Sequence, residues 1–424
     1  MNNINHYPIP FSMKFYHLLF ILLIISCQKD SQNPRSEEET EVFNLPIIRI
    51  DTQSIPIDSK EDYVDATITI EGLETNDNLV ETETKIKGRG NSTWWLGQEI
   101  GKKPYQIKFA DKTEILGMPE DKKWVLLAEL SDKSFIRNKI ARDLGQMSRF
   151  DYTPQAKYVE VYLNDEYEGL YLIGQKVEES SNRVDIGDEG YLIEIDQIHR
   201  IDEGDVYFTS EPYRRINGEN VFNIKEPSLE IDSEAYLLIK NHMREFDEVL
   251  FSADFANPTT GYAAYIDVDS FIDWFLVNEI GKSVDARWYS SIYFTYVPGE
   301  KIKMGPIWDF DLSFGNVDYA DAQYSNGFWI LNNPWLNRLY EDPVFRDKVN
   351  SRYAYYFSNL SEIMRKIDAH ALKIDSAQSR NYVRWETLGV RIWPNPVWFE
   401  TYPEEVNQLK DWITDRMNWL NTVL

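Results

Sequence analysis

The spacing of apolar residues changes from two to about 3.6 near the middle of the chain, and this change constrains the fold more than any other feature. From Leu45 onward, segments such as VDATITIEG and YQIKF alternate apolar and polar residues, as half-buried strands do. After about residue 230, long stretches place their apolar residues at helical spacing. The sequence therefore predicts an α+β protein with a β-rich lobe at about 45–225 and a helical lobe at about 230–424.

Several individual elements are expected within this frame. The segment AKYVEVYLNDEYEGLYLIGQKV indicates a β-hairpin that turns near NDEYEG. The segment DKSFIRNKIARDLGQMS is typical of a helix with Ser131 or Asp132 as its N-cap, and DVDSFIDWFLVNEIGKS of one capped by Asp269 or Ser270. The segment TETKIKGRGNSTWW begins as a strand and ends in a loop punctuated by glycines.

An apolar run at residues 15–26, FYHLLFILLIIS, precedes Cys27, the single cysteine of the chain. The run has the length of a signal-peptide core and is short for a membrane span. Because IISC resembles a bacterial lipobox, we expect residues 1–27 to be a lipoprotein signal peptide, with lipidation at Cys27. Residues 28–44 are polar and predict a flexible tether.

This leader predicts a membrane-anchored lipoprotein of the outer membrane, on its periplasmic or cell-surface side. A plain secretory leader with an incidental cysteine is the alternative, and either Met1 or Met13 can be the start. A lone cysteine at Cys27 also leaves the rest of the chain without a disulfide or a catalytic thiol.

The net charge of −26 argues against nucleic acid or anionic lipid headgroups as ligands of the general surface. Any ATP must therefore enter through a local basic patch or together with a metal ion. The 13 Trp and 26 Tyr residues are compatible with sugar binding, but large cores also use such side chains.

Three aspartates are predicted to meet at the open end of one hairpin. Asp309 and Asp311 lie in MGPIWDFDLSFGN among aromatic residues, where carboxylates need compensation. The segments SSIYFTY and KIKMGPIW indicate two strands joined by a turn near Gly299. This register places Asp285 opposite residue 313, close to the other two aspartates.

Crowded carboxylates repel one another, and a bound hard cation relieves the repulsion. Mg²⁺ and Mn²⁺ favour oxygen ligands, a few of them from the protein and the rest from phosphate and water. The aspartate cluster therefore indicates a metal site. The alternatives are a turn whose aspartates cap backbone amides, and a structural Ca²⁺ site.

A second candidate feature is the loop in KGRGNSTW. Gly88 and Gly90 allow a close approach to phosphates, and Arg89 offers a fork of donors. Lys108 follows on a predicted strand, and a strand lysine beside a glycine loop is a common way to hold nucleotide phosphates. A solvated lysine at a strand end is the alternative.

Four segments, in this order along the chain, resemble the spore coat protein H (CotH) kinase family: KGRGNSTW…KKPYQIKF, LGMPEDKKWVLLAELSDKSFIRNKIA, YVEVYLNDEYEGLYLIGQKV…NRVDI and GPIWDFDLSFGN. The resemblance extends from about Leu45 to Arg352, and the helical tail also fits. It implies an atypical protein-kinase-like fold over residues 45–424, and phosphorylation of hydroxyls on a protein substrate of unknown identity with ATP and Mg²⁺ or Mn²⁺. The family includes many Bacteroidetes lipoproteins.

The resemblance also implies roles for matching residues. Asp285 would orient or deprotonate the attacking hydroxyl. Asp309 would bind the metal, and Asp311 would assist or brace it. The implied nucleotide contacts are Lys108, for the phosphates, and Arg89 and Asn91 in the RGNST loop.

The chain departs from the family pattern at two places. Many members have an Asn about five residues after the catalytic Asp, where this chain has Ser290 and Ser291. Where many members have Glu after the GLY strand, this chain has Gln175, so that an ion pair with the phosphate lysine is missing or is supplied by Glu178 or Glu194.

These departures keep a second class of function open. A kinase scaffold without activity can bind a glycan or an outer-membrane partner through its aromatic residues. A glycosidase using Asp285 and Asp309 is a third possibility, but a metal-independent hydrolase should lack the glycine loop and the strand lysine.

Overall fold

A computed structural model of the protein describes residues 45–74, 77–209 and 220–424. The predicted leader, Cys27 and the tether lie outside these described residues. One unit of the chain spans Val42–Leu424. Among the described residues, the search for a helix that is both long and apolar enough to cross a bilayer finds none.

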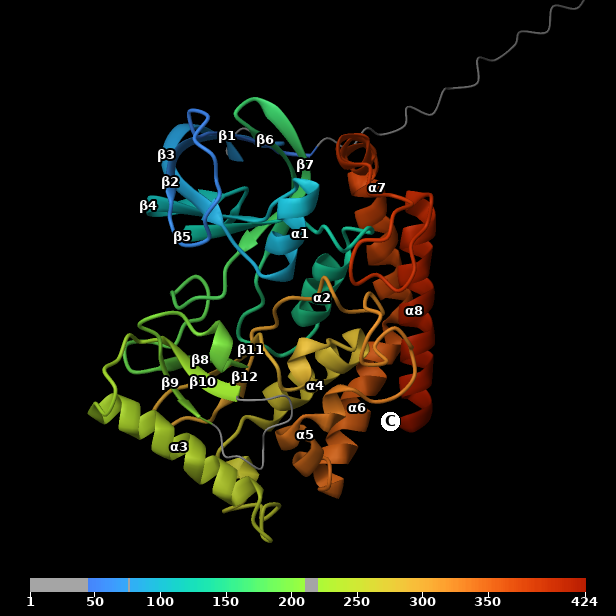
Figure 1. Ribbon diagram of the computed structural model, residues 1–424. Helices are drawn as coiled ribbons and strands as arrows, with labels where there is room; N and C mark the ends of the chain where they lie inside the picture. The colour runs from blue at the N-terminus through green and yellow to red at the C-terminus, as the bar shows by residue number, and fades with distance from the viewer. Residues whose placement is uncertain (1–44, 75–76, 210–219) are drawn as a thin grey trace, which may run out of the picture. The chain divides into compact units, whose positions relative to one another are not determined.

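Seven strands from the first part of the chain close into a β-barrel (Figure 1). They are β1 (Ile47–Asp51), β2 (Val64–Glu71), β3 (Leu79–Gly88), β4 (Tyr105–Ile115), β5 (Met118–Leu127), β6 (Ala156–Leu163) and β7 (Glu166–Gln175). The order around the barrel is β1-β2-β3-β4-β5-β7-β6, and a parallel pairing of β1 with β6 closes it. Alternate side chains, such as Ile48 and Ile50, fill the barrel core, as the alternation in the sequence predicts.

A second sheet has the order β12-β11-β8-β10-β9. Its strands are β8 (Tyr191–Gln197), β9 (Val206–Thr209), β10 (Asn220–Glu226), β11 (Ile292–Tyr296) and β12 (Lys303–Met304). Three of these strands precede residue 230 and two follow it, so the sheet crosses the lobe boundary expected from the sequence. The expected boundary does not hold for this sheet because its strands pair between distant segments, and the local sequence pattern does not encode such pairing.

The β11–β12 hairpin has the register that the sequence predicts. Phe294 pairs with Met304 and Thr295 with Lys303, around a turn in which Gly299 has a φ of +86°. The hairpin NDEYEG turn is also confirmed, because β6 and β7 pair up to Leu163 and Glu166.

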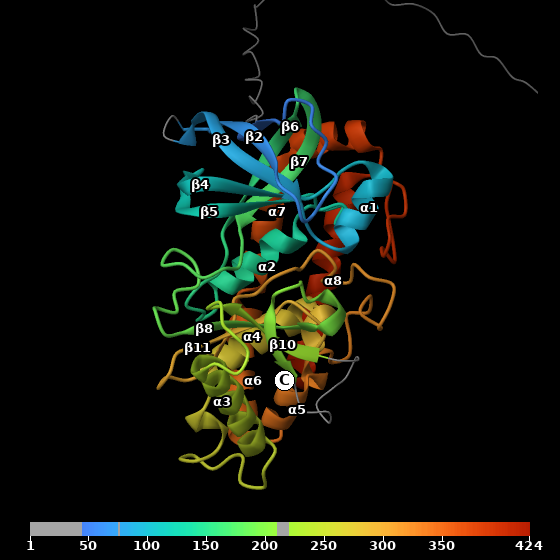
Figure 2. The same ribbon diagram turned by 60° about the vertical axis from the view of Figure 1, so that its left-hand side comes forward.

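Eight α-helices are described, most of them in the second half of the chain (Figures 1 and 2). They are α1 (Ser92–Ile100), α2 (Arg137–Gln146), α3 (Glu234–Leu250), α4 (Val268–Gly281), α5 (Pro334–Leu339), α6 (Pro343–Ser358), α7 (Leu360–Trp385) and α8 (Tyr402–Val423). A β-rich first half and a helical second half confirm the predicted α+β class. Helix α1 occupies part of the segment expected to be a loop.

Two helix starts differ from the predicted ones by a few residues. The N-cap of α4 is Asp267, whose carboxylate accepts the Ser270 amide at 2.7 Å. Helix α2 begins only at Arg137, because Asp132 holds a turn ahead of it by accepting the backbone amides of Ser134 and Arg137. In both cases the side chain of a nearby Asp accepts backbone amides at the start of the helix, and these hydrogen bonds determine where the helix begins.

Helix α8 packs beneath the segment that contains Asp309 and Asp311. The fully buried Arg416 pairs with Glu279 of α4 and donates to the carbonyl oxygens of Ser325 and Gly327. Gly315 has a φ of +77°, and a Cβ there would lie 2.4 Å from Trp412 Nε1. The last helix thus contacts the aspartate-bearing segment through tight packing at Gly315, and its buried Arg416 joins it to α4 and to residues 325 and 327.

Candidate active site

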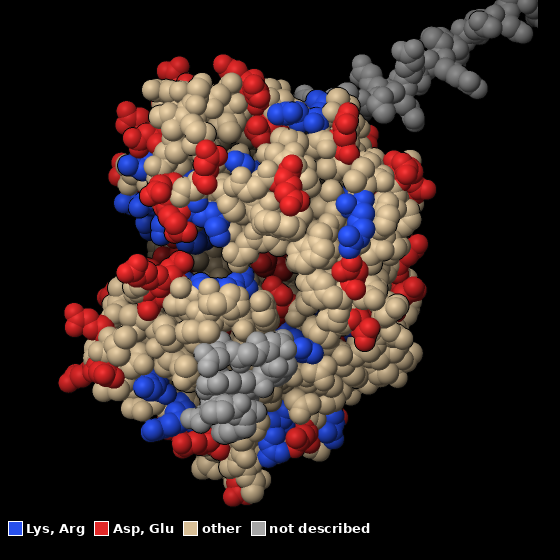
Figure 3. Space-filling view, viewed as in Figure 1, with Lys and Arg blue, Asp and Glu red and all other residues tan. Residues whose placement is uncertain are grey.

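A cavity of about 950 Å³ brings together the loop before α1, the ends of β8 and β11, the segment after α4 and the segment around Asp309. Figure 3 shows the molecule hollowed below the barrel, with Lys, Arg, Asp and Glu side chains along the edges of the hollow. This volume lies within the range of small-molecule sites. The predicted site residues Arg89, Asn91, Asp285, Asp309 and Asp311 all line the cavity.

Asp285 begins a 3-10 turn four residues after the end of α4, and its carboxylate faces the cavity. Ser290 Oγ donates to Asp285 Oδ2 at 3.2 Å, and the backbone amide of Tyr289 donates to the Asp285 carbonyl oxygen at 2.8 Å. Ser290, which stands near the position of the family Asn, therefore braces the carboxylate for which the family resemblance implies a catalytic role.

Asp309 and Asp311 lie on an irregular segment after β12. Asp309 has a φ of +67° and its side chain is exposed within the cavity. The next amide, that of Phe310, donates to Asn138 Oδ1 of α2 at 2.9 Å, and Asn316 Nδ2 donates to the Asp311 carbonyl oxygen at 2.8 Å. A left-handed backbone at a non-glycine residue is unfavourable and persists only where neighbouring contacts fix it.

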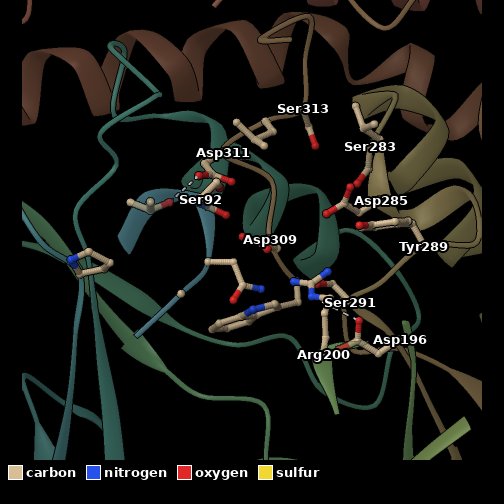
Figure 4. A pocket seen from close by; sticks show the side chains of 18 of the residues that line it. Ser92, Asp196, Arg200, Ser283, Asp285, Tyr289, Ser291, Asp309, Asp311 and Ser313 are labelled. Carbon is tan, nitrogen blue, oxygen red and sulfur yellow. Dashed lines mark hydrogen bonds and ion pairs between the residues drawn. The ribbon is translucent and has the colours of Figure 1, made fainter. Parts of the chain in front are cut away.

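The three aspartates are electrostatic neighbours, as the spacing of the hairpin predicts. Burial and the Asp309 carboxylate raise the pKa of Asp285 to about 6, while Arg200 and the Ser290 hydrogen bond act in the opposite direction. Burial and Asp309 also raise the pKa of Asp311 well above its usual range. Figure 4 shows Asp309 in the cavity, with Asp285 to one side of it and Asp311 to the other. The fold therefore concentrates negative charge that its own cations offset only in part.

Asp309 and Asp311 fit a divalent hard cation by their chemistry. The described residues contain no group of three or more Asp, Glu, His or Cys side chains arranged as a complete metal cage. Mg²⁺ is usually held by one or two carboxylates, while substrate phosphates and water complete its octahedron. The two carboxylates are thus suitable ligands for an ion that arrives with a nucleotide.

The glycine loop forms the barrel side of the cavity. Gly90 has a φ of +81°, and Asn91 directly precedes α1, whose first backbone amides have no acceptor within the helix. Burial lowers the pKa of Arg89, and the Asp309 carboxylate opposes this effect. The guanidinium also lies 5.7 Å from the centre of the Trp308 ring. Loop and arginine together provide donors for an anionic ligand.

Lys108 is the predicted site residue that the structure keeps apart from the cavity. On β4 the neighbouring Ile107 and Phe109 point into the barrel core, and Lys108 is exposed on the outer face. There it lines a separate hollow of about 770 Å³, together with Lys85 and Asp65. The phosphate role of Lys108 stays a prediction that this placement does not favour.

The second departure from the family pattern, Gln175, is buried at the end of β7. Its Oε1 accepts the Tyr152 hydroxyl at 3.0 Å and the Gln155 amide at 2.9 Å. Glu178, considered as a substitute partner, pairs instead with Lys123 and Arg183. Gln175 and Glu178 do not line the cavity. Glu194, the other candidate partner, does line it and lies 3.9 Å from Lys225 Nζ, so each glutamate pairs with a lysine other than Lys108.

Two charged residues of the cavity were missed at the level of sequence. Asp196 ends β8, and Arg200 follows four residues later with its Nε 3.5 Å from Asp196 Oδ1. Buried Glu194, whose pKa is raised to about 7 by burial and by Asp196, lies on the same strand. The only sequence signal is a set of carboxylates on a strand, because the pairing that brings β8 beside β11 is non-local.

Comparison with known proteins gives one family. A family model described as CotH kinase protein matches residues 86–420, which include the glycine loop, the three aspartates and almost all of α8. A search of the curated proteins finds no match.

Proposed function

Because the chain belongs to the CotH kinase family, which points to a kinase-like enzyme, we propose that it transfers the γ-phosphate of ATP to hydroxyl groups of a protein substrate. One observation carries the proposal. Asp285, Asp309 and Asp311 face one cavity, where burial and the Asp309 carboxylate raise the pKa of both Asp285 and Asp311, and they lie opposite a glycine loop at a helix N-terminus. Acidic metal ligands and an anion-binding loop are the two parts that phosphoryl transfer requires.

Each of the proposed site residues has a separate role in the reaction. Asp285 orients the acceptor hydroxyl and takes up its proton, a role for which a carboxylate pKa near 6 is suitable. Asp309 and Asp311 hold Mg²⁺ or Mn²⁺, and the ion, when bound, neutralises charge on the phosphates. Arg89 and the amides of the loop before α1 bind phosphate oxygens.

The proposal is tested by calorimetry of the purified protein with ATP and MnCl₂. We expect binding that needs the metal, and its loss in Asp309→Ala. Asp65→Ala is the matched control, because Asp65 is an exposed aspartate of the barrel that pairs with Lys85. Phosphate transfer from labelled ATP to mixed Ser, Thr and Tyr peptides is then measured for both variants. Equal nucleotide binding in Asp309→Ala and wild type would contradict the metal assignment, and a thermal shift with glycans alone would favour a binding module.

We further propose that the chain is a lipoprotein anchored through Cys27 at the outer membrane. The lipobox-like sequence and the polar stretch after it support this location. Labelling of growing cells with a palmitate analogue should mark the wild-type protein and not Cys27→Ala. Equal labelling of the two proteins would exclude lipidation at this cysteine.

A further inference from the structure

We propose that Arg200 is a catalytic arginine that binds the phosphoryl group while it is transferred. The inference rests on the proposed phosphotransfer function and adds a residue to it. The cavity has carboxylates for the metal and for the acceptor proton, but the charge on the moving phosphoryl group needs a cation of its own.

Arg200 lies where the second sheet meets the barrel loop. It ends the 3-10 turn Ile198–Arg200 after β8, and its side chain is only 22% exposed. On one side Nε lies 3.5 Å from Asp196 Oδ1. On the other side, with the amide oxygen of Asn91 turned toward it, Nη2 and Nε donate to Asn91 at 2.5 and 3.1 Å. The guanidinium therefore bridges the second sheet and the glycine loop.

The carboxylates that act on Arg200 include the proposed proton acceptor, Asp285, and the proposed metal ligand, Asp309. Asp285 and Asp309 both contribute to the electrostatic environment of the guanidinium, after Asp196. Figure 4 shows the guanidinium between Asp309 and Asp196, on the side of the cavity that also holds Asp285. A phosphoryl group transferred from a nucleotide held near Asp309 to a hydroxyl held by Asp285 would pass close to the guanidinium.

The step balances without a further reactant. The acceptor oxygen forms a bond to the γ-phosphorus, and the bond from this phosphorus to the β,γ-bridging oxygen breaks, with its electron pair leaving on ADP. The hydroxyl proton goes to Asp285. Arg200 forms and breaks no bond, and its planar donors stabilise the charge on the equatorial oxygens.

A purely structural role explains the contacts of Arg200 less well. Arg49 on the barrel shows what a surface pair looks like, with Nε 2.8 Å from Glu71 and both side chains about half exposed. Arg200 is more buried, its contact with Asp196 is longer, and neither its Asp196 nor its Asn91 contact uses Nη1. In the part of the chain that the structure describes, Nη1 therefore has donors that a ligand in the cavity can use.

The test compares a ground-state with a transition-state ligand. Calorimetry measures binding of a non-hydrolysable ATP analogue with Mg²⁺, and of ADP with Mg²⁺ and aluminium fluoride, which imitates the planar phosphoryl group. In wild type the fluoride complex should bind much more tightly than ADP with Mg²⁺ alone. In Arg200→Ala the ATP analogue should bind within about threefold of wild type. Most of the increase in ADP affinity caused by aluminium fluoride should be lost, and kcat should fall about 100-fold or more.

Three variants complete the experiment. Arg200→Lys should recover little of kcat, because an ammonium lacks the planar fork. Asp196→Asn, which changes a positioning residue, should lower kcat less than Arg200→Ala does. Arg49→Ala is the control for loss of a paired arginine and should keep wild-type binding and rate, and thermal melting checks that each variant folds.

The outcomes separate the two proposals. If wild type binds nucleotide and transfers phosphate while Arg200→Ala keeps both kcat and the fluoride gain, the inference is overturned and the proposed function stands. Equal weakening of the ATP analogue and the fluoride complex also overturns it, since this would make Arg200 a ground-state contact. If wild type neither binds nor transfers, the proposed function fails and the inference fails with it.

Discussion

Two charged hollows of similar size, the cavity and the hollow on the barrel, differ in how their charges are held. On the barrel, Asp65 pairs with Lys85 at 3.2 Å and both side chains are well exposed. In the cavity, Asp285 and Asp311 are partly buried, face Asp309, and have raised pKa values. Charge alone therefore does not indicate a site. A functional site is indicated where like charges are buried without full compensation, because this burial lowers the stability of the fold and a bound ligand can restore it.

The largest expected effect separates the two hollows by one matched substitution. Asp285→Asn removes the proton acceptor and should lower kcat for phosphate transfer by about 10²–10⁴-fold, with little change in ATP affinity. Asp65→Asn, the same change on the barrel, should leave kcat unaltered. Steady-state kinetics of both variants decide the matter, and a comparable loss in Asp65→Asn would remove the distinction between the hollows.

The next effect concerns the cations. Arg89→Ala should weaken ATP binding by about 10- to 100-fold, because a hydrogen bond between charged groups contributes about 1.5–3 kcal/mol. Lys85→Ala removes a barrel cation instead and should change the affinity by less than twofold. Calorimetry with ATP and Mn²⁺ measures both. If the two losses are alike, long-range charge and not contact explains nucleotide binding.

A smaller effect should appear in the pH dependence. The Ser290 hydroxyl favours the charged form of Asp285, whose pKa is about 6, so Ser290→Ala should raise this pKa. A base must be ionised, and kcat/KM should therefore fall as the pH drops through about 6 in wild type and at a higher pH in the variant. At pH 8 the loss should be only about three- to tenfold. If the acidic limb of the kcat/KM profile moved to lower pH in Ser290→Ala, the Ser290 hydroxyl would not be stabilising the charged form of Asp285.

The smallest effect is expected at Lys108. Because its side chain lies in the hollow on the barrel, Lys108→Ala should change kcat and ATP affinity by less than about twofold. The same kinetic and calorimetric measurements apply. A tenfold loss of affinity would show that the barrel hollow takes part in nucleotide binding, and would support the phosphate role predicted for Lys108.

Local patterns were sufficient for much of the fold and for the aspartate cluster. A tight turn sets the register of its own hairpin, so Gly299 and the flanking alternation predict that Phe294 pairs with Met304. Asp285 and Asp309 both lie close to this hairpin in the chain, and their meeting follows from it. The glycine signals before α1, by contrast, concealed a helix that starts directly after them at Ser92.

What depends on distant pairing could not be predicted. Arg200 reaches the cavity because β8 pairs with β11, where Glu194 lies opposite Tyr293, and no local pattern reports such a contact. Lys108 was misleading for a related reason. Alternation shows that Ile107 and Lys108 point to opposite faces of a strand, but it does not show which face lies toward the cavity.

The contact between α8 and the aspartate-bearing segment has a practical consequence for how the protein is handled. Trp412 packs against Gly315, and Arg416 joins Glu279 to Ser325 and Gly327, so α8 supports the segment that bears Asp309 and Asp311. Removing this helix to obtain a smaller fragment for crystallisation would remove that support. Inactivity of such a fragment would then report damaged packing, whatever chemistry the intact chain performs.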